Sequence, residues 1–410
     1  MANRVVVTGT GSITPLGLNT NESWTAIKDG KLGISQITSF NVDQSPVKIA
    51  AEVMNFDPAE ILGKKDARRL DRFSQFACIS ALEALEQSGV DLASEDATRF
   101  SSIIGSGVGG ILTLSEQYDV LAEKGATKVS PFLIPMMLPD MASGNVSMKL
   151  GAKGVNFSPV TACATGSDSI GMAYNLIKNG DIDMAIAGGA EAAVCPIALA
   201  GFFACRALST NPDPKTACRP FDKDRDGFIL GEGAGLLFLE SFEHADSRNA
   251  NILAEVIGYG ATSDAFHITQ PSPGGEGAAR AMNIALSDAE ISYEAVDYVN
   301  AHGTSTPLND KFETLSMKSV FNDYANKIPI SSTKSMTGHL LGAAGGVEAV
   351  LCVQSISDGV APPTINYSTP DEDCDLDYIP NEARSLDLEI AMSNNLGFGG
   401  HNASLIFKKI

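Results

Sequence analysis

Two stretches set the architecture: Arg4-Val-Val-Val-Thr-Gly-Thr-Gly-Ser12 near the start of the chain and Ala254-Glu-Val-Ile-Gly-Tyr-Gly260 in its second half. Each is an apolar run that enters a glycine-rich turn, and such runs favour β-strands. Further buried strands are predicted at 100–105 and 298–301, each followed by a helical pattern. This repeated order predicts an α/β protein with two similar halves, residues 1–250 and 251–410.

The helical patterns support the same class of fold. Apolar residues recur at three- and four-residue spacing, which predicts helices, at 73–88, 164–179, 278–288 and 343–358. Additional strands are predicted at 154–160, 184–188, 234–239 and 404–407. The sequence shows no low-complexity segment and no obvious linker between the halves.

Composition and charge exclude several classes of protein. The 410 residues are 44% hydrophobic, enough for a large core, and the formal net charge of −20 disfavours nucleic-acid and anionic-membrane partners. The first apolar run breaks too early for a signal peptide, and the apolar-leaning stretch 192–205 is too short for membrane insertion. The seven cysteines are odd in number and contain no C-x-x-C pair. We therefore expect a cytoplasmic protein with reduced thiols.

The sharpest chemical signal is the stretch Ser158-Pro-Val-Thr-Ala-Cys-Ala-Thr-Gly166, where a strand gives way to a predicted helix. Cys163 would therefore lie at a helix N-terminus. Free backbone N–H groups and the helix dipole at that position favour a thiolate and can stabilise a developing oxyanion. A buried structural cysteine is the competing interpretation.

Two histidines lie in turn-forming segments instead of on apolar faces. His302 belongs to Asn300-Ala-His-Gly-Thr-Ser-Thr-Pro307, and His339 to Ser332-Thr-Lys-Ser-Met-Thr-Gly-His-Leu340. A thiol and two imidazoles suit acyl transfer followed by stabilisation of a carbanion. For either histidine alone, a structural role is the alternative.

These motifs, together with Asn395-Leu-Gly-Phe-Gly-Gly400, follow the order and separations of the β-ketoacyl-acyl-carrier-protein synthases. The chain resembles this family from end to end, with synthase II of bacterial fatty-acid synthesis as the nearest group. The resemblance implies a thiolase-like five-layered α-β-α-β-α fold, usually a homodimer, with the cysteine in the N-terminal half and both histidines in the C-terminal half.

The resemblance also implies a decarboxylative Claisen condensation. Cys163 would take an acyl group from acyl-carrier protein, malonyl-carrier protein would lose carbon dioxide, and the resulting carbanion would attack the acyl-enzyme. The product is a 3-oxoacyl chain two carbons longer. No cofactor is implied, because the phosphopantetheine arm belongs to the carrier protein, and no metal is required, although a structural monovalent cation is compatible with the family.

Several side chains receive roles from the resemblance, position by position. His302 and His339 would stabilise the enolate, and the backbone N–H groups of Cys163 and Phe398 would form the oxyanion hole. Lys334 would organise the site electrostatically in a polar network or cation site with Glu313, Glu348 and Asn300. Thr304 and Thr306 would bind the pantetheine arm, Phe398 would act as a gate, and the acyl pocket would include Val108, Ile134 and Phe202.

An acidic carrier protein requires positive charge on this acidic chain. The predicted docking residues are Lys64, Lys65, Arg68 and Arg69, joined in space by Lys124, Lys128 and Arg206. A solvated helix face is the alternative interpretation of such a run.

Two other motifs are rejected as ligand sites. Gly105-Ser-Gly-Val-Gly-Gly110 fits G-x-G-x-x-G after a strand, but no acidic residue follows at the distance a dinucleotide site needs. Asp222-Lys-Asp-Arg-Asp-Gly227 imitates a calcium loop, yet Gly233 occupies its twelfth position. We expect a structural charged turn there.

Two positions depart from the family pattern. Asp168 stands where His or Asn is more usual and would raise the pKa of the thiol if it faced Cys163, and His401 would add a titrating group near the oxyanion hole.

The alternatives to a synthase II-type enzyme are a synthase I-type enzyme, a biosynthetic thiolase, which the HGTST segment disfavours, and the non-catalytic chain-length factor of a polyketide system, which typically lacks the cysteine. Chain length, saturation and the choice of fatty-acid or polyketide carrier are left open.

Overall fold

The computed structural model describes residues 2–410, and a ten-stranded sheet forms its framework. The strand order is β10-β9-β13-β14-β8-β1-β7-β6-β4-β5. The strands of this sheet are β1 Val5–Ile13, β4 Phe100–Gly105, β5 Asn156–Phe157, β6 Met184–Glu191, β7 Gly233–Ser241, β8 Ala254–Ser263, β9 Tyr298–Asn300, β10 Ile330–Ser331, β13 Ile390–Gly397 and β14 His401–Lys408. Two small two-stranded sheets are formed by β2 Ser35–Gln36 with β3 Ile49–Ala50, and by β11 Val360–Ala361 with β12 Arg384–Ser385.

The two halves of the sheet repeat one pairing pattern. β1, β7 and β6 are antiparallel neighbours, and β6, β4 and β5 then run parallel. In the second half, β8, β14 and β13 are antiparallel, and β13, β9 and β10 are parallel. β1 and β8, the two stretches of matching sequence, join the halves along Val5–Val7. Two similar α/β halves are thus confirmed, while the boundary at 250/251 stays a prediction.

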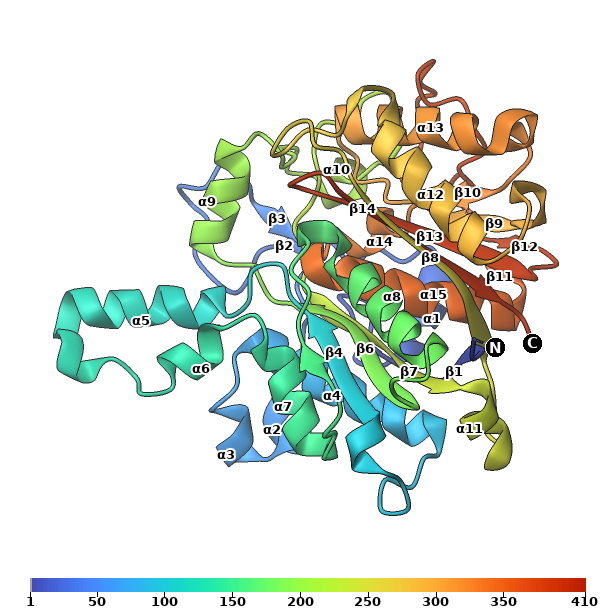
Figure 1. Ribbon diagram of the computed structural model, residues 1–410. Helices are drawn as coiled ribbons and strands as arrows, with labels where there is room; N and C mark the ends of the chain where they lie inside the picture. The colour runs from blue at the N-terminus through green and yellow to red at the C-terminus, as the bar shows by residue number, and fades with distance from the viewer. Residues whose placement is uncertain (1) are drawn as a thin grey trace.

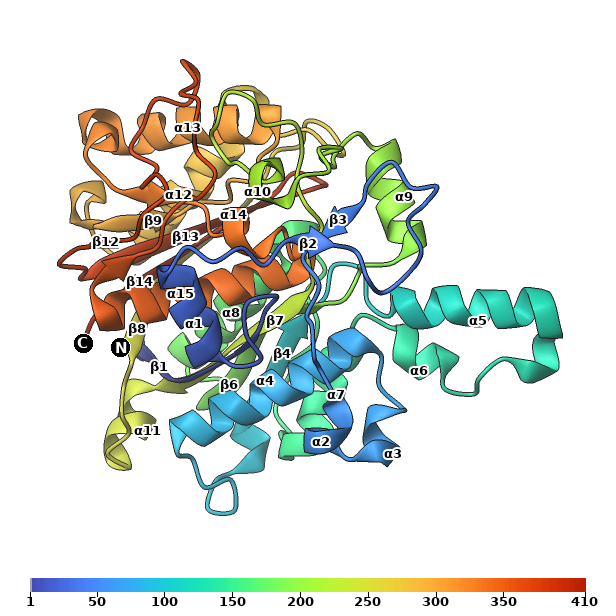
Figure 2. The ribbon, with the colours of Figure 1, turned by 180° about the vertical axis from the view of Figure 1, so that it is seen from behind.

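Helices form the other three layers (Figures 1 and 2). α8 (Thr165–Lys178) and α15 (Ala344–Asp358) lie between the half-sheets, and residues of both helices contribute to one apolar core. A second core packs α4 (Arg72–Ser88) and α7 (Met141–Leu150) on the outer face of the first half. A third core packs α12 (Glu276–Asp288) and α13 (Pro307–Phe321) on the outer face of the second half. The layers therefore run α-β-α-β-α, as the sequence resemblance implied.

The helices predicted from periodicity are all present, as α4, α8, α12 and α15. α4 illustrates the end signals: the side chain of Asp71 accepts the N–H of Phe73 at its start, and Gly89 ends it in the left-handed conformation. The α-helices are α1 Thr20–Lys28, α2 Pro58–Leu62, α3 Lys64–Ala67, α4 Arg72–Ser88, α5 Ile111–Lys124, α6 Leu133–Met137, α7 Met141–Leu150, α8 Thr165–Lys178, α9 Pro196–Ala204, α10 Pro214–Ala217, α11 Phe242–Ser247, α12 Glu276–Asp288, α13 Pro307–Phe321, α14 Lys334–Thr337 and α15 Ala344–Asp358.

One predicted strand is much shorter than expected. The stretch 154–160 pairs only over Asn156–Phe157 at the edge of the sheet, and the chain then leaves the ladder to approach Cys163. Pro159 follows two residues after this short strand, and a proline has no N–H to donate to a neighbouring strand. Across residues 2–410, no helix is long and apolar enough to span a membrane.

Candidate active site

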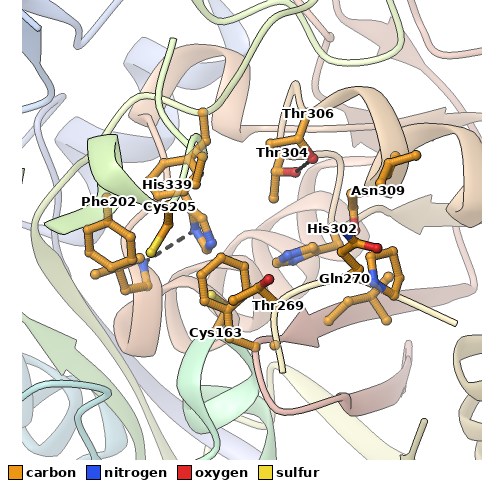
Figure 3. Close-up of a pocket in the computed structure, with 18 of the residues that line it drawn as sticks. Cys163, Phe202, Cys205, Thr269, Gln270, His302, Thr304, Thr306, Asn309 and His339 are labelled. Carbon is orange, nitrogen blue, oxygen red and sulfur yellow. Dashed lines mark hydrogen bonds between the residues drawn. The ribbon is translucent and has the colours of Figure 1, made fainter. Parts of the chain in front are cut away.

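The predicted trio meets in one cavity of about 400 Å³ (Figure 3). Cys163 comes from the turn that precedes α8, while His302 follows β9 and His339 follows α14. The two imidazole rings lie 5.3 Å apart between centroids and are nearly perpendicular. Cys163 lies more than a hundred positions before either histidine in the sequence, yet all three residues line the same cavity.

Burial favours the neutral thiol of Cys163 over the thiolate that a helix N-terminus favours. Burial raises its pKa to about 12, with Glu191 and Glu348 adding to that effect. Lys334 and the backbone N–H of Phe398 act in the opposite direction but do not offset burial. The sequence indicated that Cys163 lies at a helix N-terminus but not how deeply it is buried. Loss of hydration is the largest contribution to the raised pKa of the thiol.

Both imidazoles are neutral as well. Burial, followed by the charge of Lys334, lowers the pKa of His302 and of His339 well below the ordinary value. Nδ1 of His339 accepts the backbone N–H of Leu341 over 3.3 Å, so its single proton resides on Nε2. A neutral imidazole in this tautomer presents an N–H donor to the cavity.

A buried ion pair lies behind the trio. The ammonium of Lys334 donates to Glu348, and Nδ2 of Asn395 donates to the other oxygen of the same carboxylate over 2.7 Å. Ser167, on the first turn of α8, donates to the Asn395 amide over 2.6 Å. This chain of contacts ties the helix of the nucleophile to α14 and α15.

The other expected members of the polar network have different partners. Glu313 accepts the backbone N–H groups of His302 and Gly303, at 2.7 and 2.8 Å, and burial raises its pKa to about 7. Asn300 is fully buried, and within residues 2–410 both polar atoms of its side chain lack a hydrogen-bond partner. Thus Glu313 holds the His302 backbone, and Asn300 stands apart from the Lys334–Glu348 pair.

Most of the predicted substrate-binding residues line the cavity. Phe202, Thr304, Thr306 and Phe398 do so, and the two threonine hydroxyls lie 2.9 Å apart. Other lining residues were not predicted from the sequence, because they come from loops and from the ends of α13, β13 and β14, which only the tertiary structure brings to the cavity: Cys205, Ala207, Phe228, Asp264, Thr269, Gln270, Pro271, Pro307, Leu308, Asn309, Leu341, Leu396, Gly397 and Asn402.

Val108 and Ile134 do not line this cavity within the chain. Val108 is 36% exposed, and Ile134, on α6, is 58% exposed. α5 and α6 form an arm that projects from the body (Figure 1). The arm carries Ile134 away from the chain's own cysteine.

The predicted docking residues are all exposed and, within the described chain, form no salt bridge. Lys64, Lys65, Arg68 and Arg69 lie in and just after α3, while Lys124 and Lys128 are carried by the outer part of the arm. Arg206 follows α9 at the cavity and lines it. Figures 1 and 2 show α3, α5 and α9 as separate elements on one side of the molecule.

Asp168 does not act on the thiol as its position suggested. Its carboxylate accepts the hydroxyls of Thr161, at 2.5 Å, and Tyr259, at 2.7 Å, and it is not among the groups that raise the pKa of Cys163. Burial raises the pKa of Asp168 itself, against the effects of these two hydroxyls and of His401. Asp168 therefore braces the loop before the nucleophile.

The calcium-like stretch is a charged structural turn. Asp222 accepts the backbone N–H groups of Asp224, Ser368 and Thr369, and Arg225 donates to Asp371 over 2.5 Å. These internal contacts occupy the carboxylate of Asp222. The expectation of a structural turn is confirmed.

Comparisons with known proteins agree with this geometry. Residues 2–245 match the model of the β-ketoacyl synthase N-terminal domain, and residues 253–368 match that of the C-terminal domain. The 3-oxoacyl-[acyl-carrier-protein] synthase 2 of Staphylococcus aureus (strain COL) is 52% identical over 406 residues, covering 99% of this chain and 98% of the relative.

Solved structures are similar over their whole length. A β-ketoacyl synthase from Burkholderia phymatum STM815 superposes with a TM-score of 0.92 at 38% identity, covering 100% of both chains. A ketosynthase in complex with its type II polyketide acyl-carrier protein, bound to the hexaketide, gives a TM-score of 0.92 at 34% identity, also covering 100% of both chains.

Proposed function

This chain belongs to the β-ketoacyl synthase family, and we propose that it uses Cys163, His302 and His339 to condense malonyl-acyl-carrier protein with acyl-acyl-carrier protein. The convergence of one thiol and two neutral imidazoles in a single cavity carries the proposal. The enzyme is an acyltransferase of fatty-acid elongation, and its product is a 3-oxoacyl-carrier protein.

The first half-reaction transfers the acyl group to Cys163. The sulfur attacks the thioester carbonyl of the acyl chain, a new C–S bond forms, and the bond to the pantetheine sulfur breaks. The proton lost by Cys163 ends on the departing pantetheine thiol. The backbone N–H groups of Cys163 and Phe398 stabilise the oxyanion, and the contact of the Phe398 N–H with the thiol supports that assignment.

The second half-reaction begins with decarboxylation of the malonyl thioester. Breaking the bond to the carboxylate releases carbon dioxide and leaves its electron pair as an enolate, whose negative charge lies on the thioester oxygen. His302 and His339 donate N–H hydrogen bonds to that oxygen, which neutral imidazoles can do. The enolate carbon then attacks the acyl group, and the Cys163 thiolate leaves and is reprotonated.

The Lys334–Glu348 pair sets the electrostatics of this step. Its positive charge lowers the pKa of both histidines, which keeps them as neutral donors. Because Glu348 compensates that charge, the Lys334–Glu348 pair itself adds no net charge to the site before the enolate forms. Thr304 and Thr306 bind the pantetheine arm at the mouth, Phe202 bounds the acyl chain, and Phe398 acts as the gate.

A structural monovalent cation fits the residues around Asn300. The amide of Asn300 and the hydroxyl of Ser393, its register partner on β13, are buried without hydrogen-bond partners inside residues 2–410. Amide, hydroxyl and carboxylate oxygens are ligands for hard cations. The carboxylate of Glu313 is held near Asn300, because it accepts the backbone N–H of His302, two positions after Asn300. Such an ion would brace the backbone of His302, and no step of the reaction uses it.

The exposed arm supports a homodimer. Tyr118 on α5 is 68% exposed, Ile134 on α6 is 58% exposed, and large apolar surfaces of this kind mark interfaces. Since Ile134 does not line its own cavity, it contributes to an acyl pocket by reaching that of a second copy. Analytical ultracentrifugation of Tyr118→Glu and Ile134→Glu would show monomers if the arm makes the interface, and unchanged dimers would contradict it.

The carrier protein docks on the exposed basic residues of α3 and on Arg206, which leads into the cavity. The relative of 34% identity whose structure contains an acyl-carrier protein supports this class of partner. A location in the cytoplasm stays an expectation from sequence.

Condensation of malonyl-carrier protein with acyl-carrier proteins of six to sixteen carbons tests the proposed function. Formation of 3-oxoacyl products would establish it and define the chain-length range. No product across the series, with the protein folded, would favour a thiolase or a non-catalytic chain-length factor.

A further inference from the structure

Glu191, the last residue of β6, is a completely buried carboxylate that forms no salt bridge with any residue in 2–410. Four donors surround it instead. Its oxygens accept the hydroxyl of Ser106 at 2.7 Å and the backbone N–H groups of Gly107 at 2.8 Å, Gly342 at 3.0 Å and Val108 at 3.2 Å.

This arrangement explains the glycine-rich turn 105–110, which resembled a dinucleotide-binding loop. Backbone N–H groups that converge in such a turn form a site for an anion. Here the anion is the protein's own carboxylate. A Cβ atom added at Gly107 or at Gly342 would lie 2.8 Å from Oε2 of Glu191, so both positions need the bare backbone.

Glu191 joins two segments, the glycine-rich turn and the turn after His339, and both lie next to active-site residues. Gly342 lies three positions after His339, in the 3-10 turn Leu341–Ala343, and Leu341 is the residue whose N–H fixes the His339 tautomer. On the other side, a Cβ at Gly107 would lie 3.5 Å from the carbonyl oxygen of Ala162, the residue before Cys163. The carboxylate therefore links the His339 turn to the glycine-rich turn, which packs beside the loop of the nucleophile.

We propose that Glu191 is a positioning residue of the condensing site, whose buried carboxyl group fixes the turn after His339 against the glycine-rich turn beside the Cys163 loop. The inference rests on the proposed function and deepens it. Glu191 does not touch substrate, and its effect passes through the backbone of Gly107 and Gly342 and through its charge.

The charge of Glu191 matters because of the other groups around the thiol. Lys334 favours the thiolate, whereas Glu191 and Glu348 oppose it, and His302 and His339 are neutral. Glu348 is paired with Lys334, whereas Glu191 has only hydroxyl and N–H donors around it, and burial raises its pKa against the four hydrogen bonds that it accepts. A neutral thiol is a poor target for alkylation and oxidation, which protects the nucleophile until a thioester arrives.

Glu191→Gln tests the charge. Cys163 alkylation by iodoacetamide is followed by peptide mass spectrometry from pH 6.5 to 10, in parallel with steady-state condensation. Loss of the negative charge should shift the alkylation profile by about one pH unit to lower pH, so that alkylation at pH 8 becomes about tenfold faster. Condensation should nevertheless fall about tenfold or more in kcat, with little change in KM.

Glu191→Asp and Ser106→Ala are the matched controls. Both variants retain the carboxyl group at position 191. Glu191→Asp moves it away from its donors by one methylene group, and Ser106→Ala removes one donor, so each variant should lower kcat without accelerating the alkylation of Cys163. If Glu191→Asp accelerates alkylation as much as Glu191→Gln, looser packing explains the change and the charge role is wrong. If Glu191→Gln does not fold, wild-type turnover in both controls would overturn the positioning role.

The alkylation experiment tests the role of Glu191 separately from the proposed function of the protein. Failure of the wild-type protein to condense any carrier-bound pair would contradict the proposed function. An alkylation profile and a kcat left unchanged by Glu191→Gln would contradict the role of Glu191 alone.

Discussion

Lys334 and Glu348 form an ion pair in nearly complete burial, with side-chain exposures of 1% and 3%. The pair lies behind the two active-site histidines and couples α14 to α15. A buried charge that loses its partner is costly, whereas an exposed pair contributes little. Stability and chemistry should therefore both depend on this contact.

We predict that Lys334→Met destabilises the protein by about 3–5 kcal/mol, because it leaves the Glu348 carboxylate buried and unpaired. Urea unfolding measures the change. The double variant Lys334→Met/Glu348→Leu removes both charges and should recover much of the stability. A single variant as stable as the wild type would contradict the assigned environment of the pair.

The roles of the histidines predict the outcome of removing either one. His302→Ala and His339→Ala should each slow decarboxylation of malonyl-carrier protein by about a hundredfold or more, because one donor to the enolate oxygen is lost. Release of carbon dioxide is the measurement. His244→Gln, on α11 and outside the cavity, is the control and should keep the wild-type rate. Retained decarboxylation in both active-site variants would exclude these roles.

His244 predicts a pH dependence of stability. Hydrogen bonds to Glu240 and then to Glu95 raise its pKa to about 9, against the ordinary value of 6.5. Because the folded state holds the proton more tightly, this contribution is fully present below about pH 6.5 and is lost as the pH rises through about 9. The free energy of unfolding of the wild type should fall across that interval relative to His244→Gln. Parallel curves for the two proteins would contradict the prediction.

Charge reversal at Lys65 and Arg68 should weaken docking of the acidic carrier protein. Both residues are exposed and form no salt bridge in the described chain, so the fold should change little. The KM for acyl-carrier protein should rise about tenfold at low ionic strength, and the difference should shrink with added salt. Lys327→Glu, at an exposed lysine that also forms no salt bridge in the described chain, is the matched reversal and should leave KM unchanged. Equal KM values for all variants would exclude α3 as the docking site.

The sequence predicted the architecture well because its signals were local. The apolar runs at 5–7 and 254–256 can be recognised from neighbouring residues alone, and they form paired strands. The same holds for the periodic patterns, which form the central and outer helices. The stretch 154–160 was the exception. It was predicted as a strand over its whole length but pairs only at Asn156–Phe157, because the pairing of an edge strand depends on its neighbour in the folded sheet.

The site was predictable in its residues but not in its electrostatics. Motifs identified Cys163, His302 and His339, yet the neutral state of the thiol depends on burial, which only the tertiary structure provides. Glu191 gave no local signal, because its donors come from segments on either side of it in the sequence. The exposed position of Ile134 likewise follows from the projecting arm.

The most direct measurement of the central claim is intact-protein mass spectrometry in a single turnover. After acyl-carrier protein is added alone, Cys163 should carry the acyl group, and the adduct should disappear on addition of malonyl-carrier protein as 3-oxoacyl-carrier protein forms. Cys163→Ala should form neither adduct nor product while still releasing carbon dioxide from malonyl-carrier protein. Condensation without acylation of Cys163, or acylation that malonyl-carrier protein does not discharge, would contradict the account.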